Sequence, residues 1–433
     1  MFGLVDCNSF FASCEKVFVP KLRDQPVIVL SNNDGCVVAR SQEAKTLGIA
    51  MGVPFFQIRR KCEELGITVF SANFELYSDL SRRVMQTLRQ WCPDLQVYSI
   101  DEAFLNLRGI ENAETEAFQQ NVTRTVRQWT GIPVSFGVGP TKTLAKIATH
   151  VAKTRRIGCF TLNDSGTIQE VLRSTPIEDV WGIGRRTAKT FLSRGVRTGW
   201  DLYLQNPLTI RRDFSVCQER TVRELRGEPC LELEDFAPPK YSIQFSRSFG
   251  TPLFSEDALR HPVSAFLETA MNRLRKFGLF TNAIWLSLYG FTVGEGAAAR
   301  ERQPYSDGVT IPLECSTDDT LCAMPLVLDG LKKIYRPDVS YQKASITLLA
   351  ISTVSDAGKY RLFQTLEEQA ADDAKAEAHR NLMSVLDSLH RELGRTSVVF
   401  AVEGLEKEQE WRSRQERKSP AYTTNWDEIP RVH

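Results

Sequence analysis

The 433-residue sequence lacks the features that mark membrane-spanning, secreted and zinc-binding proteins. It has no apolar run of about 18 residues and no basic start followed by an apolar stretch, so neither a membrane span nor a signal peptide is expected. None of its ten cysteines forms a CxxC pair, and no Cys/His cluster has zinc spacing. Free thiols in a reducing cytoplasm are therefore expected, and not a disulfide scaffold.

Charge of one sign is also scarce, because the formal net charge is only +1. Any surface that binds nucleic acid must then be local and balanced by acidic surface elsewhere. The 42% hydrophobic and 25% charged content is typical of a soluble globular protein. A chain of 433 residues is too long for one ordinary core, so we expect about three or four domains.

Two adjacent acidic residues, Asp101 and Glu102, stand between two short apolar stretches. Leu95 to Ile100 and Ala103 to Leu107 are rich in strand-forming residues, so both are predicted strands. Acidic residues are depleted inside strands. The pair is therefore either an exposed charged turn or a place where charge is needed, and these residues alone favour neither.

The amino terminus favours a site. Met1 to Asn8 is a predicted strand that carries Asp6 near its end, and a predicted helix from Phe10 to Phe18 follows. Three carboxylates at the ends of neighbouring strands would form an oxygen-rich site for hard divalent cations such as Mg²⁺.

The order of predicted elements brings the three carboxylates together. When residues 19–75 are set aside, the first part of the chain reads β-α-β-β-α-β, the ferredoxin-like arrangement. In this arrangement the third strand lies between the first and the second and runs antiparallel to the first. The end of the first strand, with Asp6, is then expected beside the turn that holds Asp101 and Glu102.

Basic residues flank this predicted site on both sides. Residues 19–75 contain a predicted hairpin and helix with Arg40, Lys45, Arg59 and Arg60, which form either a solvated face or site contacts. A helix predicted to begin after Gly139 carries Lys142, Lys146 and Lys153. Lys153 either complements the helix dipole or contacts a phosphate.

The rest of the chain contains a helical region, a second β-α-β-β-α-β unit and a polar end. Gly182-Ile183-Gly184-Arg185 lies between two predicted helices, either as a helix-hairpin-helix that binds phosphate or as an ordinary turn. The second unit, residues 242–352, has no acids at the corresponding strand ends. Basic and hydroxyl residues on one open sheet face, Arg247 among them, would suit a nucleic-acid backbone. Residues 353–433 are predicted to be an interaction region that folds partly against partners.

Together these motifs resemble the Y-family translesion DNA polymerases, and within them the polymerases of SOS mutagenesis. The resemblance rests on Asp6, the Phe10-Phe11 pair, Ser99 to Ala103, Gly137 to Gly139 and Gly182 to Gly184, and extends to Ser31 to Cys36, Glu219 to Cys230 and Ser419 to Thr424. It implies an α+β multidomain right-hand polymerase with a ferredoxin-like palm, small fingers, a helical thumb with a helix-hairpin-helix, and a ferredoxin-like little finger. The expected boundaries are 1–18 and 76–165 for the palm, 19–75 for the fingers, 166–232 for the thumb, 233–241 for a linker, 242–352 for the little finger and 353–433 for a C-terminal tail.

The resemblance also implies roles for single residues. Asp6, Asp101 and Glu102, with the carbonyl of Cys7, would hold two Mg²⁺ ions. Phe11 would lie under the incoming sugar as a steric gate, unless Phe11 is a core residue and Phe10 faces the nucleotide. Lys153 and the fingers residues Gln42 and Lys45 would contact the triphosphate. Gln42 stands where many members carry Tyr and Lys45 where many carry Arg, so the fingers contacts depart from the family pattern.

Partners follow from the same resemblance. Primer-template DNA would be bound by Gly182, Gly184, Arg185 and Arg247, and the dNTP by the palm and fingers. Leu362 and Phe363 would anchor the chain on the sliding clamp, or instead end a strand of the little finger. A processed UmuD-type dimer and a RecA filament are further implied partners of a cytoplasmic, nucleoid-associated enzyme. A nucleotide cyclase and a non-catalytic DNA-binding protein are the alternatives from other classes.

Overall fold

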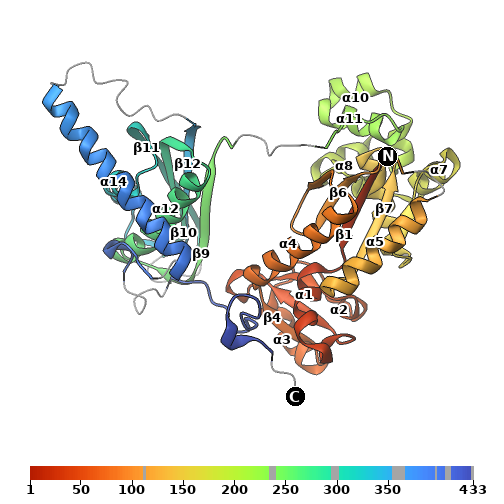
Figure 1. The fold of residues 1–433 in the computed structure, drawn as a ribbon, viewed down its shortest axis with the longest axis horizontal. Coiled ribbons are helices and arrows are strands. Elements are labelled where there is room, and N and C mark those ends of the chain that lie inside the picture. The colour runs from red at the N-terminus through yellow and green to blue at the C-terminus, as the bar shows by residue number, and fades with distance from the viewer. Residues whose placement is uncertain are drawn as a thin grey trace. The chain divides into compact units, whose positions relative to one another are not determined.

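The computed structural model describes residues 1–110, 114–233, 240–293, 302–353, 366–394, 397–404 and 411–430, without the side chains of 366–373 and 376. The chain divides into two compact units (Figure 1). Unit 1 comprises Met1–Ala237 and Gln415–His433, and unit 2 comprises Pro238–Arg414. Among the described residues, no helix is long and apolar enough to span a membrane.

The predicted palm of unit 1 is built on a five-stranded sheet in the order β5-β6-β1-β7-β8. β1 pairs antiparallel with both β6 and β7. The predicted position of the third strand between the first and the second is thus confirmed. β8 pairs parallel with β7 and was not predicted. The strands are β1 (Phe2–Cys7), β5 (Leu95–Val97), β6 (Glu102–Asn106), β7 (Val134–Gly139) and β8 (Cys159–Thr161).

Helices cover both faces of this sheet, and the alternation along β1 decides which side chains meet which helix. Val5 and Cys7 belong to the large core formed with α4 and α5. Phe2 and Leu4 face the other way and pack with Phe104 and with Ala145 of α6. Asp6 therefore points to the α6 side. The helices are α1 (Phe10–Phe18), α4 (Phe74–Trp91), α5 (Thr115–Thr130) and α6 (Lys142–Thr154).

The predicted fingers form a three-stranded sheet in the order β3-β2-β4. The expected hairpin of β2 and β3 is present, but β4 adds in parallel beside β2 after an unpredicted helix, α3. Buried aliphatic residues of the strands and helices form a small core of their own. The elements are β2 (Val27–Leu30), β3 (Val37–Arg40), α2 (Gln42–Thr46), α3 (Phe55–Glu64) and β4 (Thr68–Ser71).

The predicted thumb is helical, as its sequence indicates. Its apolar residues pack with one face of α6 through Leu144, Ile147 and Val151. The turn at residues 180–184 precedes α8, which begins directly after Gly184. The elements are α7 (Ser165–Ser174), η3 (Ile177–Asp179), α8 (Arg185–Ser193), α9 (Gly199–Tyr203), α10 (Pro207–Asp213) and α11 (Val216–Leu225).

Unit 2 contains the predicted second β-α-β-β-α-β unit. Its four strands follow the order β11-β10-β12-β9, so that here the fourth strand of the unit lies between the first and the second, unlike in the palm. Ile284, Leu286 and Ile346 pack with apolar residues of α12 and α13 in one core. The elements are β9 (Ile243–Leu253), α12 (Glu256–Lys276), β10 (Phe280–Thr292), β11 (Pro304–Thr317), α13 (Thr320–Ile334) and β12 (Val339–Ser352).

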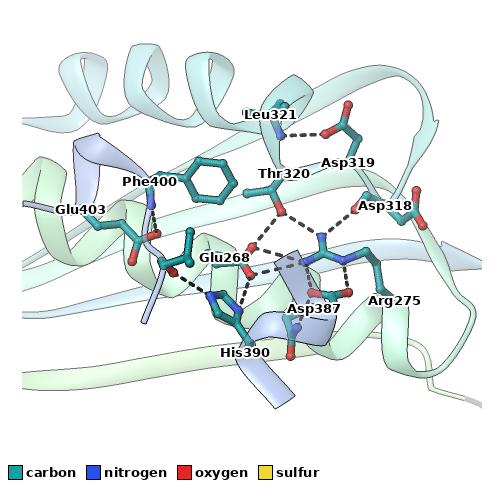
Figure 2. Close-up of polar contacts among 12 residues, drawn as sticks. Glu268, Arg275, Asp318, Asp319, Thr320, Leu321, Asp387, His390, Phe400 and Glu403 are labelled. Atoms are coloured by element: carbon teal, nitrogen blue, oxygen red, sulfur yellow. Dashed lines mark hydrogen bonds and ion pairs between the residues drawn. The ribbon is translucent and has the colours of Figure 1, made fainter. Parts of the chain in front are cut away.

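A polar helix, α14 (Leu366–Leu393), docks on unit 2 through a buried arginine (Figure 2). The Arg275 guanidinium donates to both carboxylate oxygens of Asp387, at 2.7 and 2.9 Å, and to the Thr320 hydroxyl at 2.9 Å. Glu268 lies 3.4 Å from the same guanidinium. Because each charged group has a partner of opposite sign, this network can be buried without an isolated charge.

The end of the chain differs from the expected separate tail. Residues 415–430 belong to unit 1, whereas α14 and residues 411–414 belong to unit 2. The main chain of Arg412 lies against Gly250, and Gly250 N donates to the Trp411 carbonyl at 3.0 Å. Residues 411–414 thus pack on β9, the edge strand of the unit 2 sheet. Residues 415–430 pack on unit 1, where β4 is the edge strand of the fingers sheet. A last short helix is η7 (Trp426–Glu428).

Candidate active site

The structure places the three predicted metal-binding carboxylates at adjoining strand ends. Asp6 and Glu102 are register partners on β1 and β6. Directly opposed residues share one face of a sheet, so both side chains lie on the α6 side. Cys7 N donates to the Asp101 carbonyl at 2.8 Å, which fixes Asp101 beside the end of β1. The strand order expected from the sequence therefore places Asp6 beside Asp101 and Glu102, as observed.

Each of the three carboxylates has its own side-chain partner. The Ser99 hydroxyl donates to Asp101 Oδ1 at 2.6 Å, and Lys153 forms an ion pair with Asp6. Lys146 donates to both oxygens of Glu102 at 2.9 Å. The three carboxylates do not converge as one three-donor group within 4.8 Å, and such groups among the described residues lie only in unit 2.

Burial changes the acidity of the groups at the end of β1. It raises the pKa of Asp6 to about 7, against the opposing effect of Lys153. The neighbouring Glu102 raises the Asp6 pKa further. Burial likewise raises the pKa of the Cys7 thiol. Because a nearby cation favours the charged form of a carboxylate, a further cation beside Asp6, in addition to Lys153, would keep it ionised at neutral pH.

Helix α6 reaches the carboxylates because glycines in β7 let it approach the sheet. A Cβ atom at Gly137 would lie 2.1 Å from Thr149 N and 2.6 Å from the Ala145 carbonyl, so a side chain at this position would push α6 away. The Thr149 hydroxyl donates to the Leu4 carbonyl at 3.0 Å and holds the helix in place. The motif at Gly137 to Gly139 thus explains how the α6 lysines reach the end of β1.

Lys146 was mentioned in the sequence analysis without a role, and it is the residue that the prediction missed. Its ammonium lies 4.7 Å from the ring centre of Tyr98 and 5.6 Å from that of Trp181. Trp181 Nε1 donates to the Tyr98 hydroxyl at 3.2 Å. The turn that carries Glu102 therefore contacts the predicted thumb through one lysine and two aromatic rings. The spacing of Lys142, Lys146 and Lys153 on one helix could have indicated a common face.

The cations of the fingers lie near the same carboxylates. Burial lowers the pKa of Lys45, and the positive charges of Arg40 and Lys153 lower it further, while Asp6 opposes them. Lys45 Nζ donates to the Ser9 hydroxyl at 3.1 Å. Gln42 is exposed at the start of α2. Since these cations repel one another, a polyanion bound between them would be strongly stabilised.

The two phenylalanines after Asp6 have different surroundings. Phe10 is 4% exposed and belongs to the palm core, so little of its ring is available for the predicted contact with a nucleotide. Phe11 is half-buried, and its ring stacks on Tyr77 with 4.5 Å between ring centres and 14° between planes. Phe11 packs against the palm core from its border, so of the two rings it is the more exposed one.

The glycine motif of the thumb starts a helix without a capping side chain. Gly182 has φ = 87°, a left-handed conformation that favours glycine. Gly184 is the N-cap of α8, and no side chain accepts a hydrogen bond from the first turn. Gly184 and Arg185 are exposed. The free N–H groups and the exposed guanidinium form an arrangement that can bind a phosphate.

The face of the unit 2 sheet opposite its helices carries serine hydroxyls and a lysine. Ser246, Ser287 and Ser345 are register partners across three strands, but Ser287 is 3% and Ser345 1% exposed, so the hydroxyls of these two are covered. Lys343 lies over the Tyr289 ring, 5.3 Å from its centre. Arg247 is instead the register partner of the core residue Ala344, and its guanidinium lies over the Phe245 ring. Arg247 is therefore on the helix side of the edge strand, because the alternation places it opposite to the serines.

The predicted clamp-binding residues Leu362 and Phe363 lie outside the described residues.

Three family models match the chain. The impB/mucB/samB family matches residues 5–150, and the C-terminal domain of the same family matches residues 240–362. A domain of unknown function matches residues 380–432, which include the second half of α14 and the segment that returns to unit 1.

Curated relatives align over the whole chain. Protein UmuC of Salmonella typhimurium strain LT2 is 40% identical over 436 residues and covers 100% of both chains. Protein MucB of Escherichia coli is 35% identical and covers 99% of both chains. DNA polymerase IV of Brucella melitensis is 30% identical over 66% of this chain and 63% of the relative.

Solved structures show the same fold. The Y-family DNA polymerase chimera Dbh-Dpo4(243-245)-Dbh matches 81% of this chain and 99% of its own, with a TM-score of 0.63 and 19% identity. The insertion ternary complex of Dbh DNA polymerase matches 80% and 98%, with a TM-score of 0.53 and 18% identity. The chain therefore belongs to the impB/mucB/samB family and is a UmuC-like Y-family polymerase.

Proposed function

We propose that this protein is an error-prone translesion DNA polymerase whose catalytic centre is formed by Asp6, Asp101 and Glu102. It would transfer a dNMP from a dNTP to a primer 3′-hydroxyl, directed by a template, past damaged bases. The observation that carries this proposal is the pairing of Asp6 with Glu102, beside Asp101, under the lysines of α6. Family membership supports the reaction class.

The residues present fit a divalent cation of the Mg²⁺ type. The donor set consists of three carboxylates and the carbonyl of Cys7, and hard cations prefer oxygen ligands. The raised pKa of Asp6 also fits a cation site, because a bound cation would stabilise the charged form of this carboxylate. Two bound ions would lower the pKa of the primer hydroxyl and stabilise the attacking and leaving oxygens.

The remaining residues would bind and orient the nucleotide. Lys45, Arg40 and Lys153 supply positive charge for a triphosphate, with Gln42 at the start of the same fingers helix as Lys45. Phe11 would pack against the sugar at C2′ and leave no room for a hydroxyl. Ribonucleotides would then be excluded by a clash and by loss of solvation, the latter costing roughly 1–3 kcal/mol.

DNA would be held at two places. The backbone N–H groups at Gly182 and Gly184 and the guanidinium of Arg185 would contact one phosphate. The sheet face that carries Lys343 would contact the DNA backbone without reading sequence, and Arg247 would contribute only from the edge of that sheet. We also propose that Leu362 and Phe363 bind the sliding clamp, that a processed UmuD-type dimer and a RecA filament are partners, and that the enzyme acts at the nucleoid.

Primer extension on a template with one abasic site tests the function. The purified chain would be assayed with Mg²⁺, alone and with clamp, UmuD-type dimer and RecA filament added. Asp101→Ala and Glu102→Ala should reduce extension to background and keep primer-template binding, measured by fluorescence anisotropy. Asp338→Ala, an exposed carboxylate of unit 2, is the control. Extension near the wild-type rate in either active-site variant would show that the metal site is misassigned.

A further inference from the structure

A segment from the end of the chain, residues 415–425, lies along the edge of the fingers sheet in unit 1 (Figure 1). Arg417 N donates to the Ser71 hydroxyl at 2.9 Å, and Ser71 N donates to the Arg417 carbonyl at 3.0 Å. The Arg417 guanidinium lies 5.1 Å from the centre of the Phe55 ring. The segment thus extends the sheet beyond β4, although it carries no apolar pattern that would predict a strand. We call it the returning segment.

The returning segment also reaches the palm. Asn73 is the N-cap of α4, and its amide donates to the Ser419 hydroxyl at 3.0 Å. The Tyr422 ring stacks on Phe18 at the end of α1, with 4.7 Å between ring centres and 10° between planes. Ser419 is 5% exposed. These contacts place a buried hydroxyl and an aromatic ring of the returning segment at the meeting point of α1 and α4.

A fully buried carboxylate lies between α1 and α4 at this point. Glu15 and Tyr77 are both 0% exposed, and the Tyr77 hydroxyl donates to Glu15 Oε1 at 2.6 Å. Burial raises the pKa of Glu15 to about 7, against the effects of the Tyr77 and Ser419 hydroxyls. A buried carboxylate needs such polar partners. Of the two carboxylate oxygens of Glu15, only Oε1 has a hydrogen-bond partner among the described residues, and Oε2 has none. The returning segment reaches the same place through Asn73, because the Asn73 amide donates to the Ser419 hydroxyl and the Asn73 carbonyl accepts from Tyr77 N at 3.1 Å.

Tyr77 connects this carboxylate to the proposed sugar contact. The face of the Tyr77 ring stacks on Phe11, with ring centres 4.5 Å apart. The Phe74 ring meets the Phe11 ring edge-on, with 5.8 Å between ring centres. Tyr77 is thus held at its hydroxyl by Glu15 and supports Phe11 with its face. A change in the position of Tyr77 would be transmitted directly to the Phe11 ring, because cores are close-packed and transmit strain.

We propose that the returning segment, through its contacts with Asn73 and Phe18, holds α1 and α4 around the Glu15–Tyr77 pair and so positions Tyr77, with the result that the Phe11 ring stays where it excludes ribonucleotides. This rests on the proposed function, in which Phe11 is the steric gate. Part of the domain of unknown function would then set the sugar selectivity of a pocket built by residues more than 300 positions earlier in the chain. Glu15, Tyr77 and Ser419 are positioning residues here, since none of them is expected to touch the nucleotide.

The change in sugar selectivity should be moderate, because the positioning residues act on the nucleotide only through the Phe11 ring. Substitutions along a packed chain of side chains commonly change a distant equilibrium by a factor of about 2 to 30. The Phe11→Ala change removes the ring itself, so its effect on the ratio of dNTP to rNTP insertion should be larger. The positioning variants should act mainly on the relative KM of the two nucleotides and should leave the maximal rate of dNTP insertion largely intact.

The experiment compares single-nucleotide insertion of a dNTP and its rNTP by the whole chain and its variants. Tyr77→Phe removes the hydroxyl and keeps the ring, and the double variant Ser419→Ala/Tyr422→Ala removes the contacts of the returning segment. Both should lower the dNTP-to-rNTP selectivity about 2- to 30-fold. Glu15→Gln retains an acceptor for the Tyr77 hydroxyl and should keep selectivity near wild type, whereas Glu15→Ala should not.

Two controls separate this inference from the function on which it rests. Lys418→Ala removes only a surface ion pair of the same segment with Glu75 and should leave selectivity within about twofold of wild type. Phe11→Ala tests the gate itself. If Phe11→Ala leaves selectivity unchanged, the gate assignment is wrong. If Phe11→Ala admits ribonucleotides but Tyr77→Phe and the double variant, folded by circular dichroism, behave like Lys418→Ala, the positioning role is rejected.

Discussion

Both carboxylate oxygens of Glu102 accept a hydrogen bond from the ammonium group of Lys146, at 2.9 Å each. Lys153 neutralises Asp6 in the same way, so two of the three proposed metal ligands are paired with cations of one helix. A divalent cation that binds these oxygens has to compete with the lysines. When no metal ion is bound, the two lysines would thus reduce the net negative charge of the site.

The first prediction concerns this competition. Lys146→Met should lower the Mg²⁺ concentration that gives half-maximal primer extension, because the variant leaves the negative charge of Glu102 uncompensated. Titration calorimetry with Mn²⁺ should show tighter binding in the same variant. Lys142→Met is the matched control, since the Lys142 ammonium is held by Gln96 and the Glu232 carbonyl. An unchanged or higher Mg²⁺ requirement in Lys146→Met would contradict the competition.

The second prediction separates the two neighbouring phenylalanines. Phe11→Ala should admit ribonucleotides while deoxynucleotide synthesis continues, because Phe11 is only half-buried beside the proposed site. Phe10→Ala should chiefly destabilise the protein, by about 3–5 kcal/mol for a fully buried ring. Insertion kinetics and denaturant unfolding of both variants check this. A loss of sugar discrimination in Phe10→Ala alone would reverse the assignment.

The third prediction is a pH dependence of stability that depends on Glu15. Burial raises its pKa from 4.5 to about 7, so between these values the folded state keeps a proton that the unfolded state has released. The free energy of unfolding should therefore fall as pH rises through this range, by up to about 3 kcal/mol. Glu15→Gln cannot lose this proton and should gain stability over wild type from pH 5 to pH 8. Parallel stability curves for the two proteins across this range would refute the prediction.

The fourth prediction concerns the docking of α14. Although burial opposes it, Arg275 lowers the pKa of Asp387, so the pair is ionised in the folded protein. Asp387→Asn leaves the buried guanidinium with a weaker set of partners and should destabilise unit 2 by about 3 kcal/mol. Thermal unfolding measures this. Asp338→Asn, in an exposed pair with Arg336, should change stability much less, and equal effects of the two variants would argue against a buried ionic anchor.

The fifth prediction is that the sliding clamp binds Leu362 and Phe363. Two adjacent apolar residues in a polar stretch can fill a pocket on a partner. Retention on immobilised clamp should be lost in Leu362→Ala/Phe363→Ala, with Leu382→Ala, an exposed leucine of α14, as the control. If wild type, the double variant and Leu382→Ala are retained equally, Leu362 and Phe363 do not bind the clamp.

The arrangement of the palm could be predicted because its signals are local. The strands around Asp6 and Glu102 are short apolar runs that can be recognised one by one. Once four of them are assigned to the ferredoxin-like arrangement, its strand order predicts which strands lie side by side. Periodicity could not tell that Phe10 is buried and Phe11 only half-buried. The two residues stand four and three positions before Cys14, so both fit the apolar stripe of the helix.

The contacts that sequence reasoning missed depend on distant parts of the chain. The Lys146–Glu102 pair requires α6 to lie against β7, which depends on the missing side chain of Gly137. The returning segment is polar and without periodicity, so its composition indicates a solvated tail. Its contacts on unit 1 include the exposed edge of β4, the Asn73 side chain and the Phe18 ring, which lie more than 300 residues earlier in the chain.

The return of residues 415–425 to unit 1 also has a consequence for biosynthesis. The Arg417–Ser71 hydrogen bond joins residues 346 positions apart in the sequence. A chain folds from its N-terminus while it is being made, so the fingers and palm would leave the ribosome long before the residues that contact Asn73 and Phe18 exist. A nascent or prematurely terminated chain would therefore expose an unfinished nucleotide pocket, and sugar selectivity would be acquired only after most of translation is over.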